Sequence, residues 1–161
     1  MLEKRVGAVS IWFFKTFLKY DNVLHFVSSR VGGVSKAPYA FLNLGFHVGD
    51  DPQNVLQNRK LLASTLGIPL DCFTTAKQIH DGNVKIITEQ LKGCVYNALE
   101  NSWYFNLWEA NKAQLLQMGI PAQNIEMAGL CTYCNSDKFF SARHQRGKTG
   151  RFGVGIMLKD E

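Results

Sequence analysis

Cysteine, proline and histidine are scarce in this 161-residue sequence, with four of each. So few cysteines exclude a disulfide scaffold, and no stretch reads as a secretory leader, so we expect reduced thiols and a cytoplasmic protein. No long hydrophobic run is present: the apolar stretch 8–18 is interrupted by Lys15 and is too short to cross a bilayer. We therefore expect a strand or core element there, and no membrane partner.

Charged residues make up only 19% of the sequence, and no repeat or low-complexity tract occurs, which excludes a disordered chain or a coiled coil. Apolar and aromatic residues are abundant instead, at 46% and 12%. This composition is that of a globular domain, and we expect a single domain over residues 1–161. The formal net charge of +5 suits an anionic partner such as phosphate or nucleic acid.

Hydrophobic spacing and turn residues predict alternating strands and helices. The helix over 52–66 has Asp51 as its N-cap and Gly67 as its end, and a second helix is predicted over 106–118. The predicted strands cover 23–29, 73–78, 83–88 and 151–159. We therefore expect a layered domain of the mixed-sheet α/β or α+β class.

The sequence context of two of the four histidines is typical of a functional residue: His47 lies among glycines and carboxylates, and His80 lies beside a predicted turn. Either could be catalytic or bind a ligand, although a single histidine more often satisfies loop backbone groups. Cys131 and Cys134 form a CTYC pair, which would suit half a zinc site or a redox couple. With no second pair at matching spacing, we favour ordinary buried thiols.

Two loops could hold an anion. Residues 28–35 (SSRVGGVS) place Arg30 beside two glycines, with a tight turn as the alternative reading. Residues 141–151 concentrate four cations, and a solvated basic loop is the ordinary explanation. Nucleic acid is a less favoured partner, because it would need exposed aromatic side chains, whereas Phe139 and Phe140 read as core.

Four motifs in this order resemble the YfiH-like or laccase-domain family, also called multicopper polyphenol oxidase and linked to purine nucleoside phosphorylase activity. These motifs are SSRVGGVS, YAFLNLGFHVGDDPQNVLQNRKLL, KQIHDGNV and CTYCNSDKFFSARHQRGKTGR. The resemblance begins near His25 and covers the rest of the chain, and it implies the YfiH-like fold in a shortened form.

The resemblance also implies a zinc or copper ion held by a His and a Cys–His pair from a later segment. Only the first ligand has a match, at His80. After Thr88 the chain passes directly to LKGCVYNALEN, which resembles a region beyond that segment. A catalytic zinc needs three protein ligands, so we expect this chain not to bind the metal tightly by itself.

By resemblance, Arg30, Asn43, His47 and Arg143 line the substrate pocket, where they would hold a purine nucleoside and phosphate. The implied activity is phosphorolysis of adenosine or inosine, with metal-dependent adenosine deamination as a further reaction. One alternative is an inactive, shortened relative that acts as a binding protein, and another is a copper-dependent polyphenol oxidase. Four histidines are too few for a multicopper centre.

Overall fold

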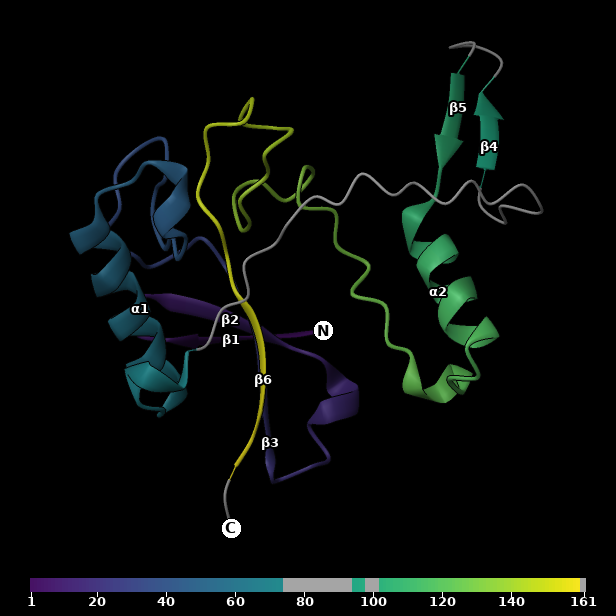
Figure 1. Ribbon diagram of the computed structural model, residues 1–161, viewed down its shortest axis with the longest axis horizontal. Helices are drawn as coiled ribbons and strands as arrows, with labels where there is room; N and C mark the ends of the chain where they lie inside the picture. The colour runs from purple at the N-terminus through teal and green to yellow at the C-terminus, as the bar shows by residue number, and fades with distance from the viewer. Residues whose placement is uncertain (74–93, 98–101, 160–161) are drawn as a thin grey trace. The chain divides into compact units, whose positions relative to one another are not determined.

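The computed structural model describes residues 1–73, 94–97 and 102–159 (Figure 1). The contacts of the chain group into two compact units: unit 1 comprises Met1–Thr75 and Ala128–Glu161, and unit 2 comprises Ala76–Met127. His80, the strand predicted over 83–88 and nearly all of that predicted over 73–78 lie outside the described residues. The single domain stays a prediction.

Unit 1 is built on a four-stranded sheet whose neighbouring strands all run antiparallel. The sheet order is β1-β2-β3-β6, and the strands are β1 (Leu2–Val6), β2 (Val9–Phe13), β3 (Val23–Ser28) and β6 (Val154–Leu158). Figure 1 shows the late strand β6 beside the early strand β3, with Val27 paired to Val154. The strands predicted over 23–29 and 151–159 are confirmed with shorter bounds, as is the α+β class.

The helix of unit 1, α1 (Pro52–Leu66), begins and ends where its local sequence predicts. The Asp51 side chain accepts a hydrogen bond from the Gln53 N–H at 2.9 Å, and Pro52 occupies the first turn, where no N–H is needed. Gly67 ends the helix at a φ of +70°, a left-handed conformation that glycine adopts without a steric penalty.

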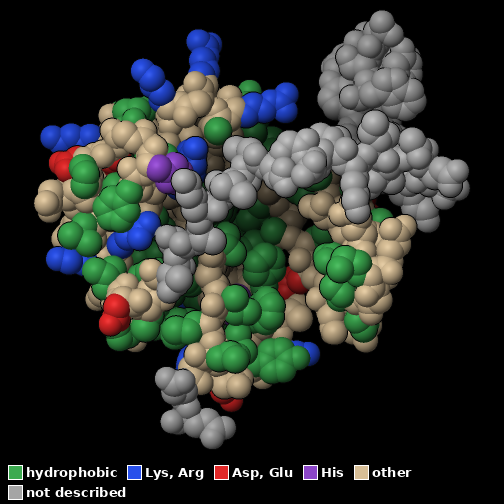
Figure 2. All heavy atoms as spheres, in the orientation of Figure 1, with side chains coloured by type: hydrophobic (Ala, Val, Ile, Leu, Met, Phe, Trp, Pro, Cys, Tyr) green, Lys and Arg blue, Asp and Glu red, His purple; other side chains and the backbone are tan. Residues whose placement is uncertain are grey.

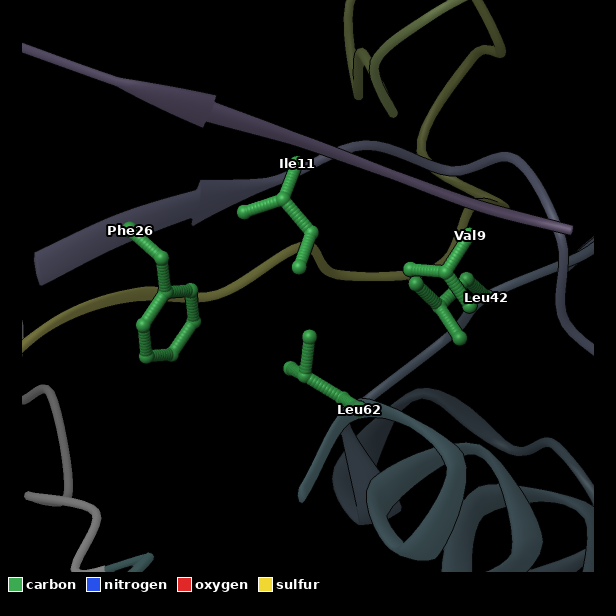
Figure 3. Packing of buried hydrophobic residues seen from close by; sticks show 5 residues of the cluster. All are labelled: Val9, Ile11, Phe26, Leu42 and Leu62. Carbon is green, nitrogen blue, oxygen red and sulfur yellow. The ribbon is translucent and has the colours of Figure 1, made fainter. Parts of the chain in front are cut away.

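The core of unit 1 lies between α1 and the sheet. Its central residues, shown in Figure 3, are Val9, Ile11, Phe26, Leu42 and Leu62. Leu62 points from α1 toward Ile11 and Phe26 on the sheet, while Leu42 brings the loop before α1, residues 29–51, against Val9. Each buried aliphatic side chain contributes about 1.5–3 kcal/mol, so this cluster fixes helix, sheet and loop together.

Unit 2 contains the antiparallel strands β4 (Cys94–Asn97) and β5 (Ser102–Phe105), followed by α2 (Leu107–Gln117). The Asn106 side chain caps α2 by accepting hydrogen bonds from two backbone N–H groups, at 3.1 and 3.3 Å. The helix predicted over 106–118 is therefore confirmed, whereas the strand pair before it was not predicted. In the described parts of the chain, no helix has the length and apolar character that a bilayer crossing requires.

Candidate functional site

The loop before α1 is centred on Asn43, whose side chain is completely buried. Its Nδ2 donates to Asp50 Oδ2 at 2.9 Å and to the Gly45 carbonyl at 3.3 Å. Its Oδ1 accepts from the backbone N–H groups of Gly45 and Arg151, at 3.0 and 2.8 Å. Because these bonds use both donors and both lone pairs of the amide, Asn43 joins the loop to the segment before β6.

Asn58 holds the same loop from the helix, and it too is completely buried. Its Oδ1 accepts from the Val34 N–H at 2.8 Å. Its Nδ2 lies 2.8 Å from Ser35 Oγ and 3.1 and 2.9 Å from the carbonyl oxygens of Phe41 and Asn43. Asn58 is a residue that the sequence motifs did not predict, although an amide on the apolar face of a predicted helix is a signal for such a buried polar group.

Arg59 of α1 and Asp50 of the loop complete this framework. The Arg59 guanidinium donates to the Leu44 carbonyl through Nε and Nη2, at 3.0 and 2.8 Å, and lies 4.6 Å from the centre of the Phe46 ring. Burial lowers the pKa of Arg59 from its ordinary value. Asp50 Oδ2 accepts from Ser35 Oγ at 2.6 Å. The loop backbone is therefore fixed by side-chain hydrogen bonds.

The Arg30 side chain, expected in the substrate pocket, is half-buried and engaged within the protein. Its Nε donates to the Ala40 carbonyl at 2.8 Å and Nη2 donates to the same oxygen, while Nη1 donates to the Ser136 carbonyl at 2.8 Å. The guanidinium lies 4.7 Å from the centre of the Phe140 ring, and burial lowers its pKa. Gln145 Oε1 lies 3.4 Å from Nη1. Arg30 thus ties three segments of unit 1 together.

The two glycines after Arg30 are required by close packing. Gly32 has a φ of +93°, and a Cβ on it would lie 2.0 Å from the Ala8 carbonyl oxygen. A Cβ on Gly33 would lie 2.3 Å from the Phe41 carbonyl oxygen. Both distances are far below van der Waals contact, so the tight-turn reading of residues 28–35 describes this loop.

His47 is the one expected site residue of the loop that faces solvent. A Cβ on Gly45 would lie 3.4 Å from His47 Cε1 and 3.0 Å from Arg151 Cγ, so these two side chains lie together over Gly45. Arg151 Nη1 donates to the carbonyls of Thr149 and Gly150, at 3.2 and 3.0 Å. The structure therefore places His47 and the aliphatic stem of Arg151 against the same glycine, while the Arg151 guanidinium donates back to carbonyls of its own loop.

Arg143, the remaining expected site residue, is exposed, with its guanidinium 5.9 Å from the centre of the Tyr133 ring. Figure 2 shows lysine and arginine side chains projecting from the end of unit 1 that carries the loop before β6. In the described residues none of the four cations of 141–151 forms an ion pair with a carboxylate. Phe139 and Phe140 are buried, as predicted.

The expectation of buried thiols at Cys131 and Cys134 is wrong. Cys134 is exposed and Cys131 is half-buried, because both lie on a surface turn before Phe139.

No metal centre is found among the described residues: no group of three His, Cys, Asp or Glu side chains able to hold an ion occurs in 1–73, 94–97 or 102–159. His80, the one matched ligand, lies outside these ranges.

The fold and the order of these loops agree with known proteins. The profile of the family described as multi-copper polyphenol oxidoreductase laccase matches residues 24–99 and 89–159, which together cover most of the chain. The chain belongs to this family. The two matched stretches overlap at 89–99. This overlap begins just after Thr88, where the sequence passes directly to a region that resembles a later part of the family.

Curated relatives named purine nucleoside phosphorylase match parts of the chain. The protein of Bacteroides thetaiotaomicron is 47% identical over 91 residues, which are 56% of this chain and 34% of that protein. That of Corynebacterium glutamicum is 50% identical over 62 residues, or 38% of this chain and 25% of the relative. The matched regions thus span about a quarter to a third of the length of these relatives.

Two solved structures share the fold. The Bacillus licheniformis hypothetical protein YfiH superposes with a TM-score of 0.82 at 19% identity, over 98% of this chain and 99% of the other. YlmD from Geobacillus stearothermophilus superposes with a TM-score of 0.77, also at 19% identity, over 98% of both chains. The YfiH-like fold expected from the sequence is thereby confirmed.

Proposed function

We propose that this protein acts in the phosphorolysis of purine nucleosides such as adenosine or inosine, in the cytoplasm. The observation that carries the proposal is that His47 and Arg151 both lie against Gly45 and both face solvent, on a loop whose backbone is fixed by the hydrogen bonds of the buried Asn43. A guanidinium suits a phosphate, because it donates charge-assisted hydrogen bonds to phosphate oxygens, and an imidazole can donate or accept a hydrogen bond with a nucleoside. The names of the curated relatives supply the reaction class.

In phosphorolysis a phosphate oxygen forms a bond to the anomeric carbon while the bond from that carbon to the purine breaks. The products are a sugar 1-phosphate and the free base, which takes up a proton. Positioning and electrostatic stabilisation are the main contributions a protein makes to such a displacement. We assign phosphate binding to Arg151 and Arg143, and contact with the nucleoside to His47.

Arg30 and Asn43 are assigned as positioning residues in this proposal. Their hydrogen bonds go to backbone groups and to Asp50 and Gln145 within the protein. Asn43 accepts directly from the Arg151 N–H at 2.8 Å, so it sets where the backbone of Arg151 lies relative to the loop of His47. A change at either residue would therefore act on the site by moving the groups above it.

The metal implied by the family is not part of the proposed reaction steps. Within the described residues the donor set does not fit a zinc or copper centre, since no three suitable side chains lie together. His80 stays a proposed ligand outside that part of the chain. Deamination of adenosine is kept as a separate arm of the test, because it would require activated water.

The test is release of free base from adenosine and from inosine by the purified chain, with and without phosphate and with and without added zinc. We expect phosphate-dependent release that His47→Ala and Arg151→Gln each reduce at least tenfold, the effect of losing about 1.4 kcal/mol of transition-state stabilisation. Lys148→Gln, an exposed cation of the same loop, is the matched control and should retain activity.

The remaining arms separate the alternatives. Loss of release in His80→Ala together with zinc dependence would bring a metal into the site. Inosine formed from adenosine without phosphate would reveal the deaminase reaction. A folded chain that releases no base under any of these conditions contradicts the proposal and favours the inactive binding protein.

A further inference from the structure

Cys131 and Cys134 lie on one surface turn, and the proposed phosphorolysis does not use their thiols. The two residues are three positions apart in a turn that Asn135 stabilises, because its backbone N–H and its Nδ2 both donate to the Cys131 carbonyl, at 3.0 and 2.9 Å. Cys134 is exposed and Cys131 is half-buried, so a small molecule can reach them. Neither thiol is in a disulfide.

The surroundings of Cys131 favour its thiolate form. The backbone N–H and the thiol of Cys134 donate hydrogen bonds to the Cys131 sulfur, and the Tyr133 N–H adds a third. These bonds, with a smaller contribution from the positive charge of Arg143, lower the pKa of Cys131. The hydrogen bond with Cys131 raises the pKa of Cys134. A thiol of lowered pKa beside one of raised pKa suits thiol exchange, because the thiolate is the attacking form.

The turn is also held from its far end. The carbonyl of Ser136 accepts from Arg30 Nη1 at 2.8 Å, and the carbonyl of Lys138 accepts from the Arg30 backbone N–H at 2.7 Å. The Tyr133 ring lies 5.2 Å from that of His144. The backbone that carries both sulfurs is therefore positioned before any reaction takes place.

We propose that Cys131 and Cys134 form a redox-active dithiol that exchanges with small-molecule disulfides of the glutathione type. The Cys131 thiolate attacks one sulfur of the disulfide, and the sulfur–sulfur bond breaks to release one thiolate. The Cys134 thiol then loses its proton and attacks Cys131, which releases the second thiolate. Two electrons pass from the two cysteines to the small molecule, which becomes two thiols, and the protein gains one disulfide.

Reversibility follows from the position of the pair. A disulfide between residues three apart closes a very short loop, so it adds little entropic stabilisation, and exposed disulfides are the readily reduced ones. The same thiols can therefore return to the reduced form when the ratio of thiol to disulfide rises.

The experiment uses the full chain with Cys72→Ser and Cys94→Ser, so that Cys131 and Cys134 are its only thiols. The chain is incubated with glutathione disulfide and followed by intact mass. We expect a loss of two hydrogen atoms, reversed by dithiothreitol. With Cys134→Ser added, the reaction should stop at a mixed disulfide with glutathione on Cys131. Failure to form the intramolecular disulfide at any glutathione ratio overturns the proposal.

The order of attack has its own test in the two single-thiol chains. Cys131 should react with glutathione disulfide faster at neutral pH than Cys134 does in the chain with Cys131→Ser. Arg143→Gln should slow Cys131 by about threefold, because loss of the positive charge raises the pKa of Cys131 and leaves less thiolate at neutral pH, while Arg143→Lys restores the rate and Lys148→Gln leaves it unchanged. A faster Cys134, or no dependence on the charge at 143, overturns the assignment of Cys131 as nucleophile.

Discussion

The loop before α1 and the loop over 141–151 are both rich in polar side chains, but they use them in opposite ways. In the first loop Asn43 and Asp50 turn inward and form hydrogen bonds with the protein. In the second, Arg143 and Lys148 face solvent without a carboxylate partner among the described residues. A polar residue in a motif can therefore shape the site or contact a ligand, and residue type alone does not decide which.

The largest expected effect comes from the glycine at the base of the inward-facing loop. Gly32→Ala would place a Cβ 2.0 Å from the Ala8 carbonyl oxygen at a φ of +93°, so we expect a loss of more than about 4 kcal/mol or failure to fold. Gly147→Ala, in the basic loop, has no atom within 4 Å of its new Cβ and should cost about 1–2 kcal/mol for its positive φ. Urea unfolding of both variants measures the difference, and equal losses would contradict the comparison.

Asn43 and His47 test the same contrast within one loop. Asn43→Ala removes one hydrogen bond from the Asp50 carboxylate and the Asn43 acceptor of the Gly45 and Arg151 N–H groups, so we expect it to lower the free energy of unfolding by about 3 kcal/mol. His47→Ala should change it by no more than about 0.5 kcal/mol, because the side chain is exposed. Thermal or urea unfolding of the two single variants is the measurement. A large loss for His47→Ala would show that His47 supports the loop.

The two arginines expected in the pocket give a smaller difference. Arg30→Lys removes a planar group that donates to two carbonyl oxygens and stacks on Phe140, so we expect a loss of about 2 kcal/mol. Arg143→Lys keeps an exposed charge and should stay within about 0.5 kcal/mol of the unaltered protein. Equal stability of both variants would mean that the hydrogen bonds of Arg30 contribute nothing net.

The smallest effect concerns reactivity alone. The pKa of Cys131 is lowered, and the thiolate is the reactive form, so its alkylation by iodoacetamide should rise at a lower pH than that of a free cysteine, whose pKa is about 8.5. Cys72, an exposed thiol of unit 1, is the internal reference. Peptide mass analysis across pH gives both profiles, and in urea the two should coincide. Coincident profiles in the folded chain would contradict the lowered pKa.

Local features of the fold could be predicted because their causes are local. Asp51, Pro52 and Gly67 specify both ends of α1 within a few residues, and the structure has the helix where they place it. The pairing of β3 with β6 could not be predicted in the same way. It joins Val27 to Val154 across most of the sequence. The alternation of apolar and polar residues within a strand does not specify which other strand it pairs with.

Only part of the candidate site could be predicted from the sequence, again because some of its contacts join residues that are far apart in the chain. Arg30 and Asn43 were identified through their motifs, but burial decides their hydrogen bonds and a motif does not report burial. Asn58 was missed because helical spacing was read for apolar residues only. Arg151 was seen as one cation of a basic loop, since its place over Gly45 beside His47 depends on a hydrogen bond from its N–H to Asn43.

The pairing of β6 with β3 also has a consequence for synthesis of the chain. During translation the first three strands and α1 leave the ribosome long before Val154–Leu158 has been made. One edge of β3 therefore stays unpaired until β6 has been synthesised. An unpaired strand edge is open to other chains, and a contact between such distant residues forms slowly. The nascent protein thus depends on β6 to cover this edge of β3, and a ribosome that stalls before β6 is made would display an incomplete sheet to chaperones and proteases.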